Sequence, residues 1–534
     1  MIFHRLLLAA GLLVLASAAA AADLYVSNSG SDVLPRASVT QLLPWKTIQH
    51  AASSAVAGDT VYIRAGNYPE QVKVGVSGTS TAQIVFRNYP GENPTMDETS
   101  QTVSGSNGSL IAIVNHSYIT IQGLTLQNWT TTNSSFLPVG IEVTGACVGI
   151  QIRGNVLHHI WQSNTSGGDA HGVRVYGSNA TAISQFVMDG NQIYDMRTGS
   201  SEVVSINGNV TDFKITNNII HDVNNIGIDL IGFENTYSGT ANPPASVDRA
   251  RNGVVADNTI YNVDSRYNPA YNGDFTTGGG DAAADGLYAD GGQSIVIERN
   301  FVYACNYGVE LASEHSNGSA DTITLRDNII HHCHLAGLAM GGYSSTKGTA
   351  VNCLIANNTF FQNNTIYPLD TSSNNSGQIF LQFYVTNCTF KNNIVWARSD
   401  TGEMILHYPG GGTTAQKELG TTNTFLDNLY YCDGATPVWE AYHNGKHNVY
   451  SSLSAWQASG VCAGDAGSTI ANPLFQGGEP GQDAQAPAYQ LAPGSPAVNT
   501  GQASPAYQPG SGELDFFKKA RVRGARVDRG ADEQ

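Results

Sequence analysis

One short motif recurs nine times along the chain: an alternating apolar stretch, then an asparagine, then a second apolar stretch, as in "VVADNTIYNV" and "VIERNFVYAC". Successive copies stand 27 to 42 residues apart. A constant motif at variable spacing is typical of a solenoid whose coils differ only in loop length. Asparagine at a sharp bend can adopt the left-handed conformation and hydrogen-bond to equivalent residues of a stack. We therefore predict an internal ladder with one asparagine per coil, formed by Asn155, Asn191, Asn218, Asn258, Asn300, Asn328, Asn358, Asn393 and Asn428.

A second strand also recurs once per coil, as in "HGVRVYG", "IGIDLIG", "DGLYADG" and "YGVELAS". Strict alternation places its apolar residues inside and every second residue outside. The 58 glycines and the low charged fraction of 13% fit many short strands and turns. The outward residues then form one face of a parallel β-solenoid, with a first column of Glu142, Arg174, Ser205, Asp229, Tyr288, Glu310 and Ala339, and Asp290 in a second column.

With these coils, the N-terminal segments "PWKTIQHAASSAV" and "GDTVYIRAGNY" make residues 24–435 resemble the pectin-lyase-like superfamily of secreted carbohydrate-active proteins. The resemblance implies an all-β chain folded as a right-handed parallel β-helix, with a short helix over its N-terminal end. Because this fold carries lyases, hydrolases and epimerases, the resemblance predicts the architecture more narrowly than the reaction.

Three segments are expected. Residues 1–22 have a signal-peptide pattern, with Arg5, an apolar run and small residues before Asp23, which predicts a secreted or periplasmic protein. Residues 23–435 are expected to form the β-helix, and residues 436–534 a C-terminal capping segment. No later run is long and apolar enough to cross a bilayer.

Charge and cysteine content limit the partners. The formal net charge of -17 disfavours nucleic acid and weighs against a polyanionic substrate, although local patches can override it. We expect a monomer that binds a polysaccharide or oligosaccharide. The seven cysteines include no CxxC pair, which argues against a zinc ribbon. Cys305 and Cys333 each follow a ladder asparagine by five residues, which predicts neighbouring coils within disulfide reach, and Cys432 and Cys462 form a second candidate pair.

Carboxylates gather between Asp285 and His315 despite the scarcity of charge elsewhere. With coils stacked about 4.8 Å apart, the Cα atoms of Asp290 and Glu310 should lie roughly 8 Å apart, and those of Asp229 and Glu310 roughly 10 Å. Glu314 follows in the next turn, while Glu298 belongs to another face and is interpreted as structural. Paired carboxylates suit glycoside hydrolysis, in which one acts as acid and the other as base or nucleophile.

The same stretch has a local resemblance to β-helix glycosidases such as β-xylosidases. It implies that Asp290, in "GLYAD", is the nucleophile or base and that Glu314, in "ELASEH", is the acid, with Glu310 as a competing acid. Candidate substrate-binding residues around them are Arg174, His171, Asp229, Asp285, Tyr288 and His315. Two long inserts add aromatic residues suited to sugar stacking, namely Phe233, Tyr237, Tyr267, Tyr271 and Phe275.

Two other functions stay open. A polysaccharide lyase would need a cationic base, for which Lys214 and Arg174 are the evident candidates, and the acid cluster would then bind Ca²⁺. The hydrolase needs no cofactor. A non-catalytic carbohydrate-binding surface protein is the third alternative. Histidines after the asparagine turns, such as His158, His221 and His331, are expected to stack between coils and not to bind metal.

Overall fold

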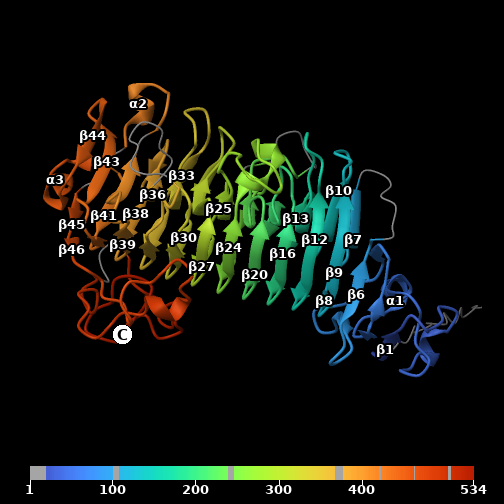
Figure 1. Cartoon of the computed structure of the whole chain (residues 1–534). Helices are drawn as coiled ribbons and strands as arrows, with labels where there is room; N and C mark the ends of the chain where they lie inside the picture. The colour runs from blue at the N-terminus through green and yellow to red at the C-terminus, as the bar shows by residue number, and fades with distance from the viewer. Residues whose placement is uncertain are drawn as a thin grey trace, which may run out of the picture.

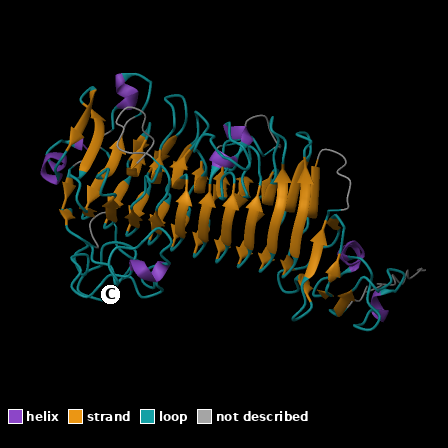
Figure 2. Ribbon diagram, in the orientation of Figure 1, coloured by secondary structure: helices purple, strands orange, loops and turns teal. Residues whose placement is uncertain are grey.

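The computed structural model describes residues 20–99, 107–237, 244, 246–366, 377–407, 409–419, 422–461, 464–502 and 507–534. The chain winds into three long, parallel sheets that run the length of the molecule (Figures 1 and 2). Each coil passes through sheet A, from β1 (Asp23–Val26) to β45 (Asp465–Ala466), and then sheet B, from β3 (Gly66–Asn67) to β46 (Thr469–Ile470). It then passes through sheet C, from β4 (Val72–Val74) to β43 (Val438–His443), against which β44 (Lys446–Tyr450) pairs antiparallel. The predicted parallel β-helix is confirmed.

The predicted asparagine ladder is present between sheets A and B. Each ladder Asn donates from Nδ2 to Oδ1 of the ladder Asn in the next coil, at 2.9–3.1 Å from Asn155 through to Asn428. One detail differs from the prediction. The left-handed residue is the one before the ladder Asn, such as Asn217 (φ 56°), Asp257 (φ 60°) or Asp327 (φ 57°). The ladder side chain can thus point inward while its neighbour turns the chain.

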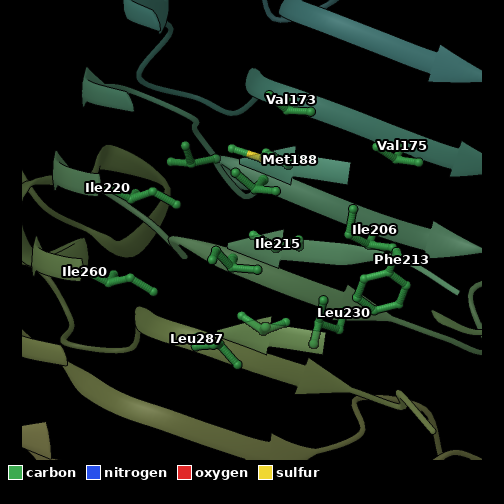
Figure 3. Packing of buried hydrophobic residues seen from close by; sticks show 14 of the residues in the cluster. Val173, Val175, Met188, Ile206, Phe213, Ile215, Ile220, Leu230, Ile260 and Leu287 are labelled. Atoms are coloured by element: carbon green, nitrogen blue, oxygen red, sulfur yellow. The ribbon is translucent and has the colours of Figure 1, made fainter. Parts of the chain in front are cut away.

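Apolar side chains from all three sheets fill the interior. Figure 3 shows part of this core, with Met188 and Ile215 from sheet A, Ile220 and Ile260 from sheet B, and Leu230 from sheet C. The register predicted for sheet C is also found, because the outward residues Glu142, Arg174, Ser205, Asp229, Tyr288, Glu310 and Ala339 lie opposite one another on successive strands. The sequence pattern thus identified correctly which side chains face outward.

A stack of rings follows the outer face of sheet B. His158, Tyr194, His221, Tyr261, Tyr303 and His331 lie with neighbouring centroids 4.8–5.1 Å apart and nearly parallel planes. The prediction that these histidines stack is confirmed. Since each ring covers the face of the next, only ring edges remain for solvent, so this stack stabilises coil packing and offers no flat platform to a sugar.

The two ends of the solenoid are covered differently. At the N-terminal end, helix α1 (Ile48–Ser54) buries Ile48, Ala51 and Ala52, as predicted, and Thr47 caps the His50 N–H. At the other end the sheets continue past residue 435 through β43 (Val438–His443) to β46. The following segment then runs back along sheet B, where Phe475, Tyr489 and Leu491 pack with Phe361 and Trp396 (Figure 1).

The described cysteines are all free thiols. Cys305 and Cys333 do lie on neighbouring coils, two residues beyond the paired Tyr303 and His331, and their side chains share a hydrogen bond instead of a disulfide. The proposed partner Cys462, like the signal-peptide residues 1–19, lies outside the described residues. Among the helices of the described part, none is long and apolar enough to span a membrane.

Candidate active site

The predicted carboxylates come together on sheet C. They stand on β21 (Ile228–Ile231), β25 (Asp285–Asp290) and β28 (Tyr307–Ala312), three strands in direct succession. Asp229, Asp285, Asp290 and Glu310 are only 2–8% exposed, although Asp229, Asp290 and Glu310 point away from the apolar core. We call these four residues, with Glu202, the acid cluster.

Loops on both sides cover the cluster and explain its burial. Before β25 runs the loop 264–284, which contains η2 (Ser265–Tyr267) and η3 (Pro269–Tyr271). Asn306 holds both ends of this loop: its Oδ1 accepts the N–H groups of Ser265 (2.9 Å) and Ala284 (3.0 Å), and its Nδ2 donates to Asp264 (2.9 Å). On the other side, turns follow β21, β28 and β32 (Ala336–Met340). The outward face of β21, β25 and β28 is thereby largely shielded from solvent.

Asp285 and Glu310 form a carboxyl–carboxylate pair. The Asp285 carboxyl donates a hydrogen bond to Glu310, which also accepts from Gln382 Nε2 at 3.1 Å. Burial raises the pKa of Glu310 to about 7, against the two hydrogen bonds that favour its ionised form. Burial and the neighbouring Glu310 charge raise the pKa of Asp285 well above its usual range. One proton is therefore held by the pair at neutral pH.

Asp290 is the other outward acid of β25. Its Oδ1 accepts the backbone N–H of Glu314 at 2.8 Å, and the Ser313 hydroxyl also donates to this carboxylate. Burial, followed by the charges of Glu314 and Glu234, raises the pKa of Asp290 well above its usual range. Glu314 itself is exposed on the turn after β28, with His315 half-buried beside it. Glu314 thus contributes a backbone contact and a nearby charge to the cluster, while its carboxylate stays in solvent.

Two further acids of the site, Glu202 and Glu234, were not predicted from the sequence. Glu202 lies one coil before Asp229, and burial with the Glu234 charge raises its pKa to about 8. Glu234 follows β21 and accepts from Asn207 Nδ2 at 2.6 Å. Glu202 could have been found from the strand register. Val173 lies opposite Val204, and counting back two residues on each strand places Glu202 opposite His171. Glu234 lies in a long insert, where no repeat sets the register.

Asp229 lies between these acids and is 3% exposed. Burial, followed by the charges of Glu202 and Asp290, raises its pKa well above the usual range. Its Oδ1 has no hydrogen-bond partner among the described residues. Tyr288, opposite Glu310 in the register, is also buried, and burial with the Asp290 charge raises its pKa. Asp229 and Tyr288 therefore lie opposite each other at the cluster, and their role in substrate binding stays a prediction.

Arg174 and His171 have other partners. The Arg174 guanidinium pairs with Glu142 and lies 3.6 Å from the centre of the Tyr176 ring, so its charge is already neutralised. His171 is buried and donates from Nδ1 to the Glu202 carbonyl at 2.9 Å. Burial lowers the pKa of His171 to about 3, so it is neutral. His171 thus borders the acid cluster through Glu202, whereas the ion pair of Arg174 is with Glu142, outside the cluster.

A cationic side chain near the cluster is that of Lys347, which the sequence gave no reason to select. It lies in the turn after β32, with its Nζ 4.8 Å from the centre of the Tyr343 ring. A hydrogen bond with Tyr343 raises the pKa of Lys347, and the charges of Glu314 and Asp290 add to this effect. Lys214, the earlier candidate, is exposed on sheet A in β19 (Lys214–Thr216). It is therefore on a different face from the acids.

The acid cluster does not form a calcium site as it stands. In the part of the chain that the structure describes, no three His, Cys, Asp or Glu side chains are grouped so that they could hold a metal ion. Ca²⁺ takes six to eight ionised or neutral oxygen ligands. The unpartnered Oδ1 of Asp229 is a single oxygen and does not complete a coordination shell.

The predicted aromatic residues lie in three different places. Tyr271 lies beside the cluster, since the charges of Glu314 and Asp285 contribute to its raised pKa after burial. Tyr267 and Phe275, from the same loop, instead line a cavity on the sheet B side. Phe233 packs against Arg249, whose guanidinium carbon lies 4.8 Å from the ring centre. Glu298 pairs with Arg326 at 2.7 Å on sheet A, which agrees with its structural interpretation.

Comparisons with known proteins place this architecture in a family. Residues 24–201 match the model of the Pel9A-like right-handed β-helix region, and residues 285–435 match the right-handed β-helix region. The uncharacterized protein YwoF of Bacillus subtilis is 34% identical over 475 residues, covering 89% of this chain and 92% of YwoF. The chain belongs to the Pel9A-like right-handed β-helix proteins. Pectate lyase PEL9 of Emericella nidulans is 42% identical over 79 residues, which are 14% of this chain and 18% of that enzyme.

Solved structures of Pel9A-like and other β-helix proteins are similar in fold. Pectate lyase Pel9A is 12% identical, with a TM-score of 0.45, over 97% of this chain and 98% of that one. The GH136 lacto-N-biosidase of Eubacterium ramulus is 12% identical, with a TM-score of 0.47, over 72% of this chain and 65% of that one. At this level the likeness concerns the solenoid architecture alone.

Proposed function

We propose that this chain is an exported glycoside hydrolase that acts on a polysaccharide or oligosaccharide, with Asp290 and Glu310 as its two catalytic carboxyl groups. The observation that carries the proposal is the unequal environment of these two acids on adjacent strands of sheet C. Both carboxyl groups accept two hydrogen bonds, but burial and the charges of Glu314 and Glu234 raise the pKa of Asp290 well above its usual range, whereas the pKa of Glu310 is raised to about 7. We therefore assign the proton to Asp290 and the negative charge to Glu310. Two carboxyls held in different protonation states are what glycosidic hydrolysis requires.

The two roles follow from these environments. Asp290, protonated, donates its proton to the leaving glycosidic oxygen. Glu310, ionised, either attacks the anomeric carbon or removes a proton from the attacking water. Asp285 keeps Glu310 in place by a hydrogen bond, and Gln382 does so from the next strand but one. This assignment differs from the one implied by the local sequence resemblance, in which Asp290 is the nucleophile or base and Glu314 is the acid. Here Asp290 is the acid, and Glu314 supports it by donating its backbone N–H.

Leaving-group dependence tests the assignment. Asp290→Asn should abolish cleavage of natural glycosides, while aryl glycosides with acidic leaving groups, which need little protonation, retain part of the rate. Glu310→Gln should abolish both, since loss of the attacking or base group costs several kcal/mol of barrier for any leaving group. Glu403→Gln is a matched control, because Glu403 is equally buried in sheet C, with a pKa raised to about 8 by burial, but lies outside the cluster. Full activity of Asp290→Asn and Glu310→Gln would contradict the proposal.

A second candidate is β-elimination from an acidic polysaccharide. It is favoured by Lys347, whose ammonium is close enough to Asp290 and Glu314 to feel their charges, and by the partial similarity to a pectate lyase. In that reaction Lys347 would remove the proton next to the uronate carboxyl. The acid cluster argues against it, because buried carboxyls repel a uronate unless a cation neutralises them. Ultraviolet absorbance of the unsaturated product distinguishes the two reactions.

A further inference from the structure

The N-terminal end of the solenoid, where β1 and α1 lie (Figure 1), includes Ala22, the last residue of the expected signal peptide. The Ala22 carbonyl accepts the backbone N–H of Thr60, the first residue of β2 (Thr60–Ile63), at 3.0 Å. The Ala22 side chain also packs against the edge of the apolar core. Ala20 and Ala21, by contrast, are exposed. Ala22 is therefore part of the folded domain, whereas the two residues before it lie on its surface.

The carboxylate of Asp59 lies at the backbone nitrogen of Ala22. Its Oδ1 accepts the Ala22 N–H at 2.9 Å, and Asp59 is fully buried. Its Oδ2 accepts the Val56 N–H and Nε of Arg36, both at 2.8 Å. Arg36 also pairs with Oδ1 and donates from Nη2 to the Ala20 carbonyl at 2.8 Å. Both oxygens of Asp59 are thus held by donors, and one donor belongs to the residue that adjoins the signal peptide.

The sequence alone allows several cleavage positions. Signal peptides end in two small residues separated by any one residue, and residues 18–22 are all alanine. Cleavage after Ala22 would remove both the acceptor of the Thr60 N–H and a donor to Asp59. Cleavage after Ala20 would leave the new charge one residue away from Asp59. Cleavage after Ala21 keeps Ala22 in the fold and places the new charge at Asp59.

We propose that the peptide bond between Ala21 and Ala22 is the processing site, and that the new α-ammonium group of Ala22 forms an ion pair with Asp59 inside the folded protein. The step is a hydrolysis by a signal peptidase. Water adds across the C–N bond, Ala21 leaves with the carboxylate, and the Ala22 nitrogen takes up a proton and becomes an ammonium. The mature chain then begins one residue earlier than the sequence pattern predicts. Export itself rests on the signal-peptide pattern and does not depend on the proposed hydrolase.

Cleavage changes the electrostatics of this contact. The Ala22 nitrogen is a neutral amide donor before cleavage and a charged donor afterwards, and a charged donor makes a hydrogen bond roughly twice as strong. Cleavage also removes Ala20, so Nη2 of Arg36 loses its carbonyl partner. Because the Arg36 side chain is partly exposed, water screens its repulsion from the new ammonium. The processed protein is thereby held more firmly at its first residue than the precursor.

Intact mass and N-terminal sequencing of the exported protein test the processing site. The full chain is produced in a bacterial host, and the protein is collected outside the cytoplasm. Its first residue should be Ala22. A different main first residue, or a chain that is not cleaved, would overturn the assignment.

The reactivity of the α-amine tests the ion pair. Two chains that begin at Ala21 and at Ala22 are released from a fusion without extra residues and treated with an amine-reactive ester, and the modified terminus is quantified by peptide mass. An ion pair with Asp59 favours the charged, unreactive form of the amine. The Ala22 chain should therefore react roughly tenfold more slowly at pH 7, as expected if its amine pKa is one unit higher. The rate should reach that of the Ala21 chain only at higher pH.

Substitution of the carboxylate separates the ion pair from simple shielding. Asp59→Asn should make the Ala22 chain react as fast as the Ala21 chain. Glu70→Gln is the matched control, because Glu70 also accepts two backbone N–H groups near the N-terminus, those of Ile48 and Gln49, but holds the start of α1. It should leave the slow reaction unchanged. Equal rates for the two parent chains, or slow reaction that persists in Asp59→Asn, would contradict the ion pair. If Asp59→Asn does not fold, the two parent chains alone decide, and neither measurement involves the acid cluster.

Discussion

At the scale of single residues, the acid cluster is a set of competing proton sites. Asp285, Asp290 and Asp229 all have pKa values raised by burial first and by like charges second. Hydrogen bonds from Asp285 and Gln382 favour the ionised form of Glu310, whose pKa burial raises to about 7. The chemistry therefore depends on the order in which protons leave neighbouring carboxyls.

This order predicts a bell-shaped pH profile for hydrolysis. Activity should rise as Glu310 ionises, around its pKa of about 7, and should fall at higher pH as Asp290 loses its proton. The measurement is kcat/KM from pH 5 to 10 on an aryl glycoside. Because Gln382 donates to Glu310, Gln382→Leu should move the acidic limb to higher pH. An acidic limb that stays in place would show that Glu310 is not the ionising group.

Lys347 gives a second prediction at this scale. In a hydrolase its ammonium only offsets nearby negative charge, so Lys347→Met should change turnover by no more than a few-fold and should shift the alkaline limb upward. The shift follows because loss of a cation further disfavours ionised Asp290. Complete loss of activity in Lys347→Met, together with an unsaturated product from the parent, would instead identify Lys347 as the base of a lyase.

At the scale of elements, strands could be predicted from the sequence and loops could not. Alternation within a strand determines which side chains face outward, so Asp290, Glu310 and Asp229 were correctly placed on one face of sheet C. Glu234 and Lys347 lie in turns, where no sequence periodicity predicts which way a side chain points. Loop 264–284 places Tyr271 beside the acid cluster but Tyr267 and Phe275 in the cavity on the sheet B side. This division depends on how the loop folds, and the aromatic residues in its sequence do not predict it.

Asn306 allows the loop to be tested as an element. Asn306→Ala leaves several buried groups of loop 264–284 without their partner, so we expect a loss of roughly 1–3 kcal/mol in the free energy of unfolding and a much larger fall in activity. Asn423→Ala is the matched control, since Asn423 is also fully buried and accepts the Cys388 N–H at 2.9 Å. The control should destabilise the chain similarly and keep its activity. Equal effects of both variants on kcat would show that the loop has no role in the site.

At the scale of the whole molecule, buried ionisable groups make stability depend on pH. Glu202, Glu403 and Asp327 have pKa values raised to about 8, and Glu310 to about 7, in every case by burial first. The folded state therefore binds more protons than the unfolded state above pH 4.5, and this contribution to stability is lost as pH rises through the folded pKa values. Buried histidines such as His171 and His334, with pKa values lowered to about 3 and 4, act in the opposite direction, but only below their unfolded value of 6.5.

The two effects overlap below pH 6.5, so the clear window lies above it. The melting temperature should fall from pH 6.5 to about 8 and then level off. Thermal unfolding at closely spaced pH values measures this slope, and Glu202→Gln should reduce it, because glutamine cannot ionise. A melting temperature that rises over the same range would mean that these carboxyls are ionised in the folded protein.

The C-terminal segment changes how such a stack can come apart. A plain solenoid contacts only neighbouring coils, so force applied to its last coil would peel the coils off one at a time. Here the segment returns along sheet B, where Arg529 donates to Thr469 at 2.6 Å, Arg521 pairs with Asp327 at 3.1 Å, and Lys518 reaches Asp257. The C-terminal segment thereby links coils that are not neighbours in the solenoid. Pulled from the C-terminus, the chain must first shear this strap away from sheet B, and only then can the coils unravel in sequence.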